Sequence, residues 1–261
     1  MYTLLNSNKS AMIAQQRNLD TISNNLANVN TNGYKKLKAQ FSDLYQDTLE
    51  RQGYPTTEGA ENLNYGTGVK LNKAVRQVTQ GSLTETNNNS DLAIDGQGFF
   101  RVYMADNTVA YTRSGNFKVD SAGTLVDSNG NRLSVVNRNG NELNYPNGTM
   151  KLTNDNFVVD KDGVLYREEN NNFIELGSIK TYDTIGDTSL ISVGESLFVP
   201  MEGAIMYETK NRNIQQGYLE NSNVNVADEM SDMILTQRAF QLSSTGLKTA
   251  DEMWGLVNSL R

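Results

Sequence analysis

Two long stretches, one at each end of the chain, share a seven-residue repeat of apolar positions with companions three or four positions away. The first stretch places them at Leu5, Met12, Leu19, Ile22, Leu26 and Val29. The last stretch places them at Val226, Met230, Met233, Phe240, Leu247 and Trp254. Such a repeat is typical of helices that pair along one stripe. We therefore expect two long terminal helices that form a coiled-coil-like pair.

The last stretch is apolar on more than one side. The residues that point around its circumference are Val226, Ile234, Phe240, Leu242, Met253, Trp254 and Leu256. One partner helix covers a single stripe, so this distribution indicates packing among several helices. The pattern favours contacts between subunits. The alternative is that both helices pack on the rest of their own chain as ordinary core helices.

The middle of the chain has short apolar runs separated by Gly, Asn and Asp. A local unit recurs as "VDSAGTLV", "VDSNGNRL", "VNRNGNEL" and "VDKDGVLY". Each copy places Asp or Asn after an apolar residue and Gly three positions later, which suits a turn that ends in a left-handed residue. Runs such as "GFFRVYM" and "FIELGSIKTY" have the aromatic and β-branched content of strands. The middle is therefore predicted to be an antiparallel β domain.

These patterns predict an α+β fold with three parts. A terminal helical domain comprises residues 1–32 and 222–261, an extended linker comprises residues 33–80, and the β domain comprises residues 81–221. Within the linker, the segment from Tyr45 to Asn72 has few large apolar residues and many turn formers, so we expect it to be extended and to be held by its neighbours. This segment is a candidate contact between subunits.

Asparagine is concentrated where the first helix is expected to end, in "SNNLANVNTNGYKK", and again in "NSNVNVADEM", where the second begins. Antiparallel pairing of the helices would bring both clusters to one end, where neutral amides can satisfy backbone groups and bond across subunits. Asn225 is a candidate cap of the second helix, with Asp228 and Glu229 in its first turn. The left-handed residue that stops the first helix is expected at Gly33. The candidate junction residues are Asn24, Asn25, Asn28, Asn30, Gly33, Asn223 and Asn225.

Composition narrows the possible chemistry. The 261 residues contain neither histidine nor cysteine, and the formal net charge is −7. This excludes Ser-His-Asp and Cys-His catalysis, imidazole or thiolate metal sites, and disulfides. An acidic chain argues against a nucleic-acid surface, and no apolar run is long enough for insertion into a membrane. The first residues lack the pattern of a cleaved signal peptide, which leaves the cytoplasm or a dedicated export route.

Three remaining chemical signals are weak. "DKDG" at Asp160 to Gly163 lacks the full ligand set of a calcium loop, and "DGQGFF" and "GTGV" share only G-x-G with phosphate loops. The β domain contains many carboxylates, including Asp91 and Asp95, but nothing singles out a catalytic pair. We therefore predict no catalytic residue, no cofactor and no metal. The alternative to a structural protein is a secreted, carboxylate-dependent enzyme that acts on cell walls.

Three longer motifs resemble one known family in the family's own order. They are "AQQRNLDTISNNLANVNTNGYKK", "SDLAIDGQGFFRV" with "AYTRSGNFKVDSAGTLV", and "QGYLENSNVNVADEMSDMILTQRAF". Together they resemble the axial proteins of the bacterial flagellum, the family of rod and hook subunits, over essentially the whole chain. The segment from Asp47 to Gly68 is similar to the extra stretch of distal-rod subunits. The chain departs from the family pattern mainly from about Asn137 to Asn213.

The resemblance implies a structural subunit of the flagellar rod and no enzyme. Subunits of this family assemble head to tail into a hollow helical tube that transmits torque from motor to hook, with the terminal helices inside. The implied partners are other copies of the chain, proximal-rod and hook-side proteins, and the flagellar export apparatus. The implied location is the basal body outside the cytoplasmic membrane, reached without a cleaved signal peptide. A proximal-rod or hook subunit is the alternative within the family.

Overall fold

The computed structural model describes residues 2–44, 46–48, 64–66, 68–140, 142–143, 150–170, 172–185, 190–209 and 213–259. The chain divides into two compact units. We call residues 1–27, 37–75 and 225–261 the helical unit, and residues 28–36 and 76–224 the β unit. The expected α+β class, with terminal helices and a central antiparallel β region, is confirmed. The three-part division with boundaries near residues 32, 80 and 221 stays a prediction.

The helical unit contains two long helices, α1 (Tyr2–Ala27) and α2 (Val226–Ser259). The start of α2 is as predicted, because the side chain of Asn225 accepts a hydrogen bond from the backbone N–H of Ala227 at 3.0 Å. Asp228 and Glu229 occupy the first turn, where the helix dipole favours negative charge. Neither helix among the described residues is long and apolar enough to span a membrane.

The end of α1 differs from the prediction. The helix ends at Ala27, so Val29 lies beyond it, and Gly33 lies six residues past the helix end and does not stop it. Gly33 has the expected left-handed φ of 68°. Its role is a close approach inside the β unit, because a Cβ on Gly33 would lie 2.4 Å from the backbone nitrogen of Ser114. A run of turns already ends the helix at the asparagines that follow Ala27.

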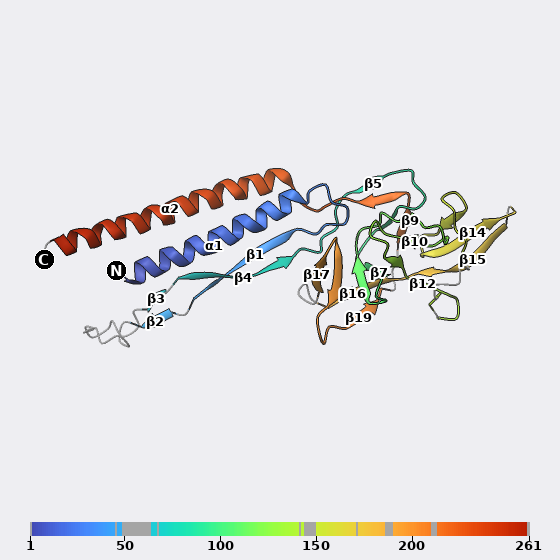
Figure 1. Cartoon of the computed structure of the whole chain (residues 1–261), viewed down its shortest axis with the longest axis horizontal. Helices are drawn as coiled ribbons and strands as arrows, with labels where there is room; N and C mark the ends of the chain where they lie inside the picture. Colours follow the sequence, from blue (N-terminus) through green and yellow to red (C-terminus); the bar gives the residue numbers. More distant parts are fainter. Residues whose placement is uncertain are drawn as a thin grey trace. The chain divides into compact units, whose positions relative to one another are not determined.

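A β ribbon lies beside α1 in the helical unit (Figure 1). Strands β1 (Leu37–Asp43) and β4 (Val69–Arg76) form a two-stranded sheet, and β2 (Gln46–Thr48) pairs antiparallel with β3 (Asn64–Gly66). Ser10 of α1 accepts a hydrogen bond from the backbone N–H of Val69 at 3.2 Å, which ties the ribbon to the helix. The expected extended character is confirmed for these strands. Residues 45, 49–63 and 67 of the predicted segment lie outside the described residues.

The β unit contains two larger antiparallel sheets and two strand pairs. The nine-stranded sheet consists of β7 (Phe99–Tyr103), β8 (Val109–Thr112), β9 (Lys118–Val119), β10 (Leu125–Val126), β11 (Arg132–Leu133), β16 (Thr181–Thr184), β17 (Leu190–Gly194), β18 (Leu197–Pro200) and β19 (Met206–Glu208). The four-stranded sheet consists of β12 (Val135–Val136), β13 (Phe157–Val159), β14 (Val164–Glu169) and β15 (Asn172–Ile179). The strand pairs are β5 (Leu83–Glu85) with β21 (Tyr218–Glu220) and β6 (Leu92–Ile94) with β20 (Ile214–Gln216).

Strand β7 divides the core of the β unit. Neighbouring side chains of a strand point to opposite faces of its sheet. Phe100 accordingly belongs to the main buried cluster, where its ring meets Phe117 edge to face at 5.5 Å between centroids. Phe99 belongs to a second cluster and meets Phe198 at the same distance. The run "FFRVYM" therefore fixes two layers of packing at one place.

The recurring Asp/Asn-to-Gly units form the predicted turns. Gly123, Gly130, Gly140 and Gly163 all have positive φ, between 74° and 83°. In each turn the glycine N–H bonds to the carbonyl of the Asp or Asn three residues earlier, at 2.7–3.1 Å. Because L side chains rarely adopt such a φ, glycine is strongly favoured at these positions. The described residues contain no cluster of three or more carboxylates that could hold a metal ion.

Candidate assembly surfaces

The two terminal helices pack antiparallel along an inner seam. Asn25 of α1 donates a hydrogen bond to Glu229 of α2 at 3.1 Å, and Asn18 donates to Thr236 at 3.0 Å. Each step along α1 is matched by an equal step backwards along α2. Figure 1 shows the two helices side by side, and their other ends lie where the chain begins and ends.

The predicted stripe residues occupy this seam unevenly. Ile22 is buried. The half-buried members are Leu5, Met12, Leu19, Leu26, Met233, Phe240 and Leu247. Val226, Met230 and Trp254 of α2 stay exposed, and Val29, beyond α1, is half-buried in the β unit. The inner seam therefore uses the heptad positions but leaves part of the α2 stripe uncovered within one chain.

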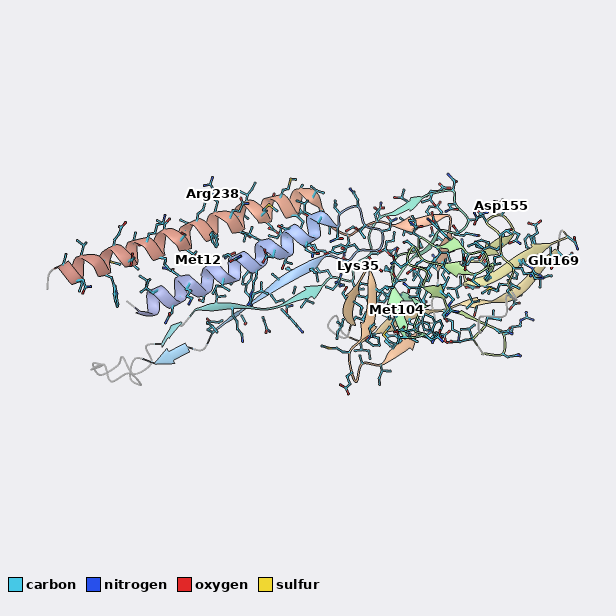
Figure 2. The ribbon with its side chains drawn as sticks, viewed as in Figure 1. Met12, Lys35, Met104, Asp155, Glu169 and Arg238 are labelled. Carbon is cyan, nitrogen blue, oxygen red and sulfur yellow. The ribbon has the colours of Figure 1, made fainter. Side chains whose placement is uncertain are left out.

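A second apolar stripe follows α2 on the side away from α1. Leu235, Leu242 and Leu256 are 67%, 75% and 65% exposed, and their seven- and fourteen-residue spacing keeps them on one face. Asp228 lies seven residues before Leu235 on the same face and is also exposed. Figure 2 shows Arg238, close to this stripe, pointing away from α1. We call Asp228, Leu235, Leu242 and Leu256 the outer stripe. Leu235 was not among the predicted residues, although its spacing from Leu242 is visible in the sequence.

Within the helical unit, Asn25 is the most connected junction residue. Its buried amide donates to the carbonyl of Leu37 at 2.8 Å and accepts from the N–H of Leu37 at 2.9 Å. Together with the bond to Glu229, these contacts tie the end of α1 to the starts of β1 and α2. Asn24 is exposed, and Asn225 caps α2.

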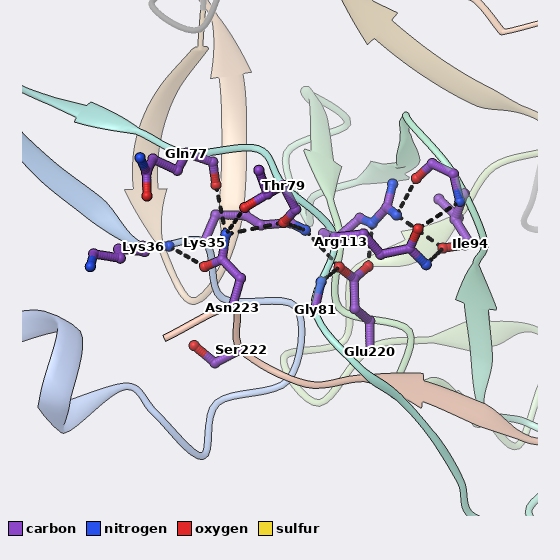
Figure 3. A network of polar contacts seen from close by, with 12 residues as sticks. Lys35, Lys36, Gln77, Thr79, Gly81, Ile94, Arg113, Glu220, Ser222 and Asn223 are labelled. Atoms are coloured by element: carbon purple, nitrogen blue, oxygen red, sulfur yellow. Dashed lines mark hydrogen bonds and ion pairs between the residues drawn. The ribbon is translucent and has the colours of Figure 1, made fainter. Parts of the chain in front are cut away.

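Within the β unit, Asn223 takes the corresponding role (Figure 3). Its Oδ1 accepts from the N–H of Lys36 at 2.6 Å, and its Nδ2 donates to the carbonyls of Gln77 at 2.9 Å and Thr79 at 3.0 Å. Asn28 accepts hydrogen bonds from Thr31 through its backbone and side-chain oxygens. Asn30 is exposed. Contacts of these residues across subunits stay a prediction.

A buried charge network lies beside Asn223 and was not predicted from the sequence. The carboxylate of Glu220 accepts from Lys35 Nζ at 2.6 Å, from Arg113 Nε and from the backbone N–H of Gly81 at 2.8 Å. The side chains of Glu220, Lys35 and Arg113 are only 1–2% exposed. Arg113 also donates to the carbonyls of Ile94, Gly96 and Gly98, as Figure 3 shows for Ile94.

Burial and the neighbouring charges shift the pKa of Lys35 in opposite directions. Burial removes water from the ammonium group and lowers the pKa of Lys35 below its ordinary value of 10.5, with the nearby charge of Glu220 opposing this shift. Lys35 Nζ also donates to the carbonyl of Thr79 at 2.8 Å. The segment from Gly33 to Lys36 is thus fastened to β21 and to the residues after β4. Gly33 adds a backbone hydrogen bond to the carbonyl of Glu220 at 2.8 Å.

Family models of flagellar proteins match three parts of the chain. The model described as flagella basal body rod protein matches residues 5–35, the D1 domain of flagellar hook protein FlgE/F/G matches residues 93–167, and the C-terminal part of flagellar basal body rod FlgEFG protein matches residues 215–260. These matches cover α1 with the segment after it, much of the β unit, and α2.

Complete relatives are similar over nearly their whole length. The flagellar basal-body rod protein FlgG of Borreliella burgdorferi is 36% identical over 97% of this chain and 96% of the relative. FlgG of Buchnera aphidicola subsp. Acyrthosiphon pisum is 37% identical over 97% of both chains. FlgG of Bacillus subtilis is 33% identical over 100% of both chains. The chain therefore belongs to the family of flagellar basal-body rod and hook proteins, and it is a structural subunit of the flagellar rod.

Proposed function

We propose that this chain builds the distal part of the flagellar rod as a hollow helical tube that transmits torque from motor to hook. The outer stripe of α2 is the observation that carries the proposal. From Leu235 to Leu256 it extends for about 32 Å, at roughly 1.5 Å per residue. Burial of one such leucine is worth about 1.5–3 kcal/mol. A helix with apolar stripes on opposite sides can pack on α1 of its own chain with one stripe and on another subunit with the other stripe.

The outer stripe can be tested without disturbing the free chain. Leu242 is 75% exposed, so Leu242→Asp should leave the helicity and the unfolding of the purified monomer unchanged. In the rod it would bury a carboxylate without a partner, which is strongly unfavourable. We expect a strain that carries only this variant to export the protein but to build no hook and to lose swimming.

The matched control is Gln241→Asp, because Gln241 is the exposed polar neighbour of Leu242 on α2 and lies off the outer stripe. This variant should support swimming. Normal swimming by the Leu242→Asp strain, with rods of wild-type length in isolated basal bodies, would refute the proposed role of the stripe.

The proposed function has three further parts, which concern catalysis, the neighbouring proteins and export. We propose that the chain performs no catalysis, that it contacts proximal-rod and hook-side proteins at its two ends, and that it leaves the cell unfolded through the flagellar export apparatus. The absence of cysteine supports export in an unfolded state, because no disulfide has to form afterwards. Deletion of the gene separates the distal-rod role from the proximal-rod and hook alternatives, since it should leave a short rod without a hook.

A further inference from the structure

The inner seam keeps one register along its length. Asn18 of α1 donates to Thr236 of α2 at 3.0 Å. Ten residues earlier on α1 and ten residues later on α2, Asn8 faces Gly246, because a Cβ on Gly246 would lie only 2.9 Å from Asn8 Nδ2. The two helices therefore match each other step for step toward the start of α1.

Helix α2 is longer than this pairing covers. The same register places Tyr2, where α1 starts, level with Glu252 of α2. Helix α2 continues to Ser259. We call residues 253–259 the α2 overhang, which extends for about 10 Å at ~1.5 Å per residue. Figure 1 shows this red end of α2 reaching beyond the start of α1.

The α2 overhang repeats the pattern of the seam. Val257 lies seven residues after Ala250, which is 0% exposed, and Met253 lies seven residues after Gly246, which meets Asn8. A spacing of seven residues returns to the same side of a helix. Val257 and Met253 thus point to the side of α2 that α1 covers further back, but they are 57% and 43% exposed. The surface of the seam continues past its partner within the chain.

The surroundings of the α2 overhang are also apolar. Leu256, the last member of the outer stripe, is 65% exposed, and Leu4 in the first turn of α1 is 45% exposed. The sequence of the overhang, "MWGLVNS", contains no charged residue. Contiguous exposed apolar surface of this kind marks sites of protein–protein contact.

We propose that the α2 overhang packs against a second copy of this chain, which takes the place of α1 beyond Tyr2. The surface that binds α1 within one chain continues unbroken into the overhang, and the proposed rod consists of many copies of this chain. The overhang and the surface that covers it are different parts of the chain, so the contact is heterologous and adds copies without closing on itself. This inference rests on the proposed function and adds an end contact to the contact of the outer stripe.

Thiol protection tests whether the overhang becomes covered. The chain has no cysteine, so one introduced thiol reports on one position. The thiol of Val257→Cys should react with N-ethylmaleimide in the purified monomer. In isolated basal bodies we expect this reaction to be at least about tenfold slower, because a covered thiol reacts only when the contact opens.

The matched control is Ser259→Cys, because Ser259 is exposed in the same overhang but lies on roughly the opposite side of the helix from Val257. Its thiol should react at similar rates in the monomer and in basal bodies. Mass spectrometry of this chain reads both reactions. If the thiol of Val257→Cys reacts equally fast in both states, or if both thiols are protected to the same extent, the proposed contact is wrong.

A photo-cross-linker identifies the occupant. In cells that carry the full-length variant Val257→p-benzoylphenylalanine, irradiation should give covalent multimers of this chain. The same replacement at Ser259 should leave it mainly monomeric. Adducts of the Val257 variant to a different protein alone, or no adduct at all, would overturn the inference.

Motility separates this inference from the proposed function. We expect Val257→Asp to leave the helicity of the monomer unchanged but to abolish swimming, whereas Ser259→Asp should swim. If the Val257→Asp strain swims while Leu242→Asp blocks rod assembly, the overhang contact fails and the proposed function stands. If the Leu242→Asp strain swims with rods of wild-type length, the proposed role of the outer stripe fails.

Discussion

Glu220→Gln tests whether a buried ion network holds the β unit together. The wild-type carboxylate faces two buried cations, Lys35 and Arg113, and also accepts the N–H of Gly81. The substitution keeps the shape of the side chain and an acceptor for Gly81, but it removes the negative charge. It also turns a donor toward one of the cations. Two positive groups, both 1–2% exposed, are then left without a counter-charge.

The expected cost is large for a single-atom change. Removal of one partner from a buried ion pair typically costs about 3–5 kcal/mol, because the remaining charge stays desolvated. Domains are stable by only about 5–15 kcal/mol. For a domain of this size each kcal/mol shifts the melting temperature by roughly 2–4 °C. We therefore expect the β unit of the variant to melt about 10 °C lower than the wild type.

The assay must distinguish the two units. Trp254, the one tryptophan, lies in α2, so tryptophan fluorescence reports on the helical unit. Near-ultraviolet circular dichroism of tyrosine reports mainly on the β unit. The matched control is Glu208→Gln. Glu208 forms an ion pair with Lys180 at 2.8 Å, and its side chain is 35% exposed. Exposed pairs contribute about 0–1 kcal/mol, so this control should melt near the wild type. Equal destabilisation by the two variants would refute the reasoning.

Three further variants test the network, a close contact and the junction. The free energy of unfolding of the wild type, measured relative to Lys35→Met, should increase as the pH rises toward 10.5. The reason is that the pKa of Lys35 is lowered in the folded chain, so the unfolded chain binds the ammonium proton more tightly. A difference between the two proteins that does not change with pH in denaturant titrations would contradict this. Gly115→Ala should destabilise the β unit by about 3 kcal/mol or more in the same titrations, since its Cβ would lie 1.5 Å from the carbonyl oxygen of Leu92. Asn25→Asp should cost the helical unit about 3 kcal/mol or more in tryptophan-monitored unfolding, whereas Asn24→Asp, at an exposed position, should change it by less than about 0.5 kcal/mol.

The features that the sequence predicted well are those that a local pattern determines. A seven-residue apolar repeat favours a helix with one apolar face, and an Asp-to-Gly spacing of three residues favours a turn that ends in a left-handed residue. The cap at Asn225 belongs to the same group, because its hydrogen bond spans only two residues. Each of these features depends on residues that are neighbours along the chain, so one sequence is enough to find them.

The features that the sequence did not reveal depend on residues far apart in the chain. Lys35, Arg113 and Glu220 lie in three segments without any shared spacing, and each alone resembles an ordinary surface charge. The predicted end of α1 lies beyond the observed end at Ala27 for a related reason. The glycine at position 33 has the backbone conformation of a helix stop, but tertiary contact with Arg113 and Ser114 is what requires it there. A positive φ explains why glycine occupies the position, but it does not show which neighbouring residue makes that backbone conformation necessary.

The asparagine clusters now have a physical explanation in each unit. In the helical unit, Asn25 bonds to both backbone groups of Leu37 as a neighbouring strand would, and in the β unit, Asn223 satisfies one N–H and two carbonyls. An amide side chain donates from its NH2 group and accepts at its carbonyl oxygen, both without a formal charge. Aspartate would present only acceptors to the carbonyls, lysine would present only donors, and either would bring a charge into a buried site. Asn25 and Asn223 each meet backbone groups of both kinds, an N–H and at least one carbonyl, so a neutral amide suits both buried positions.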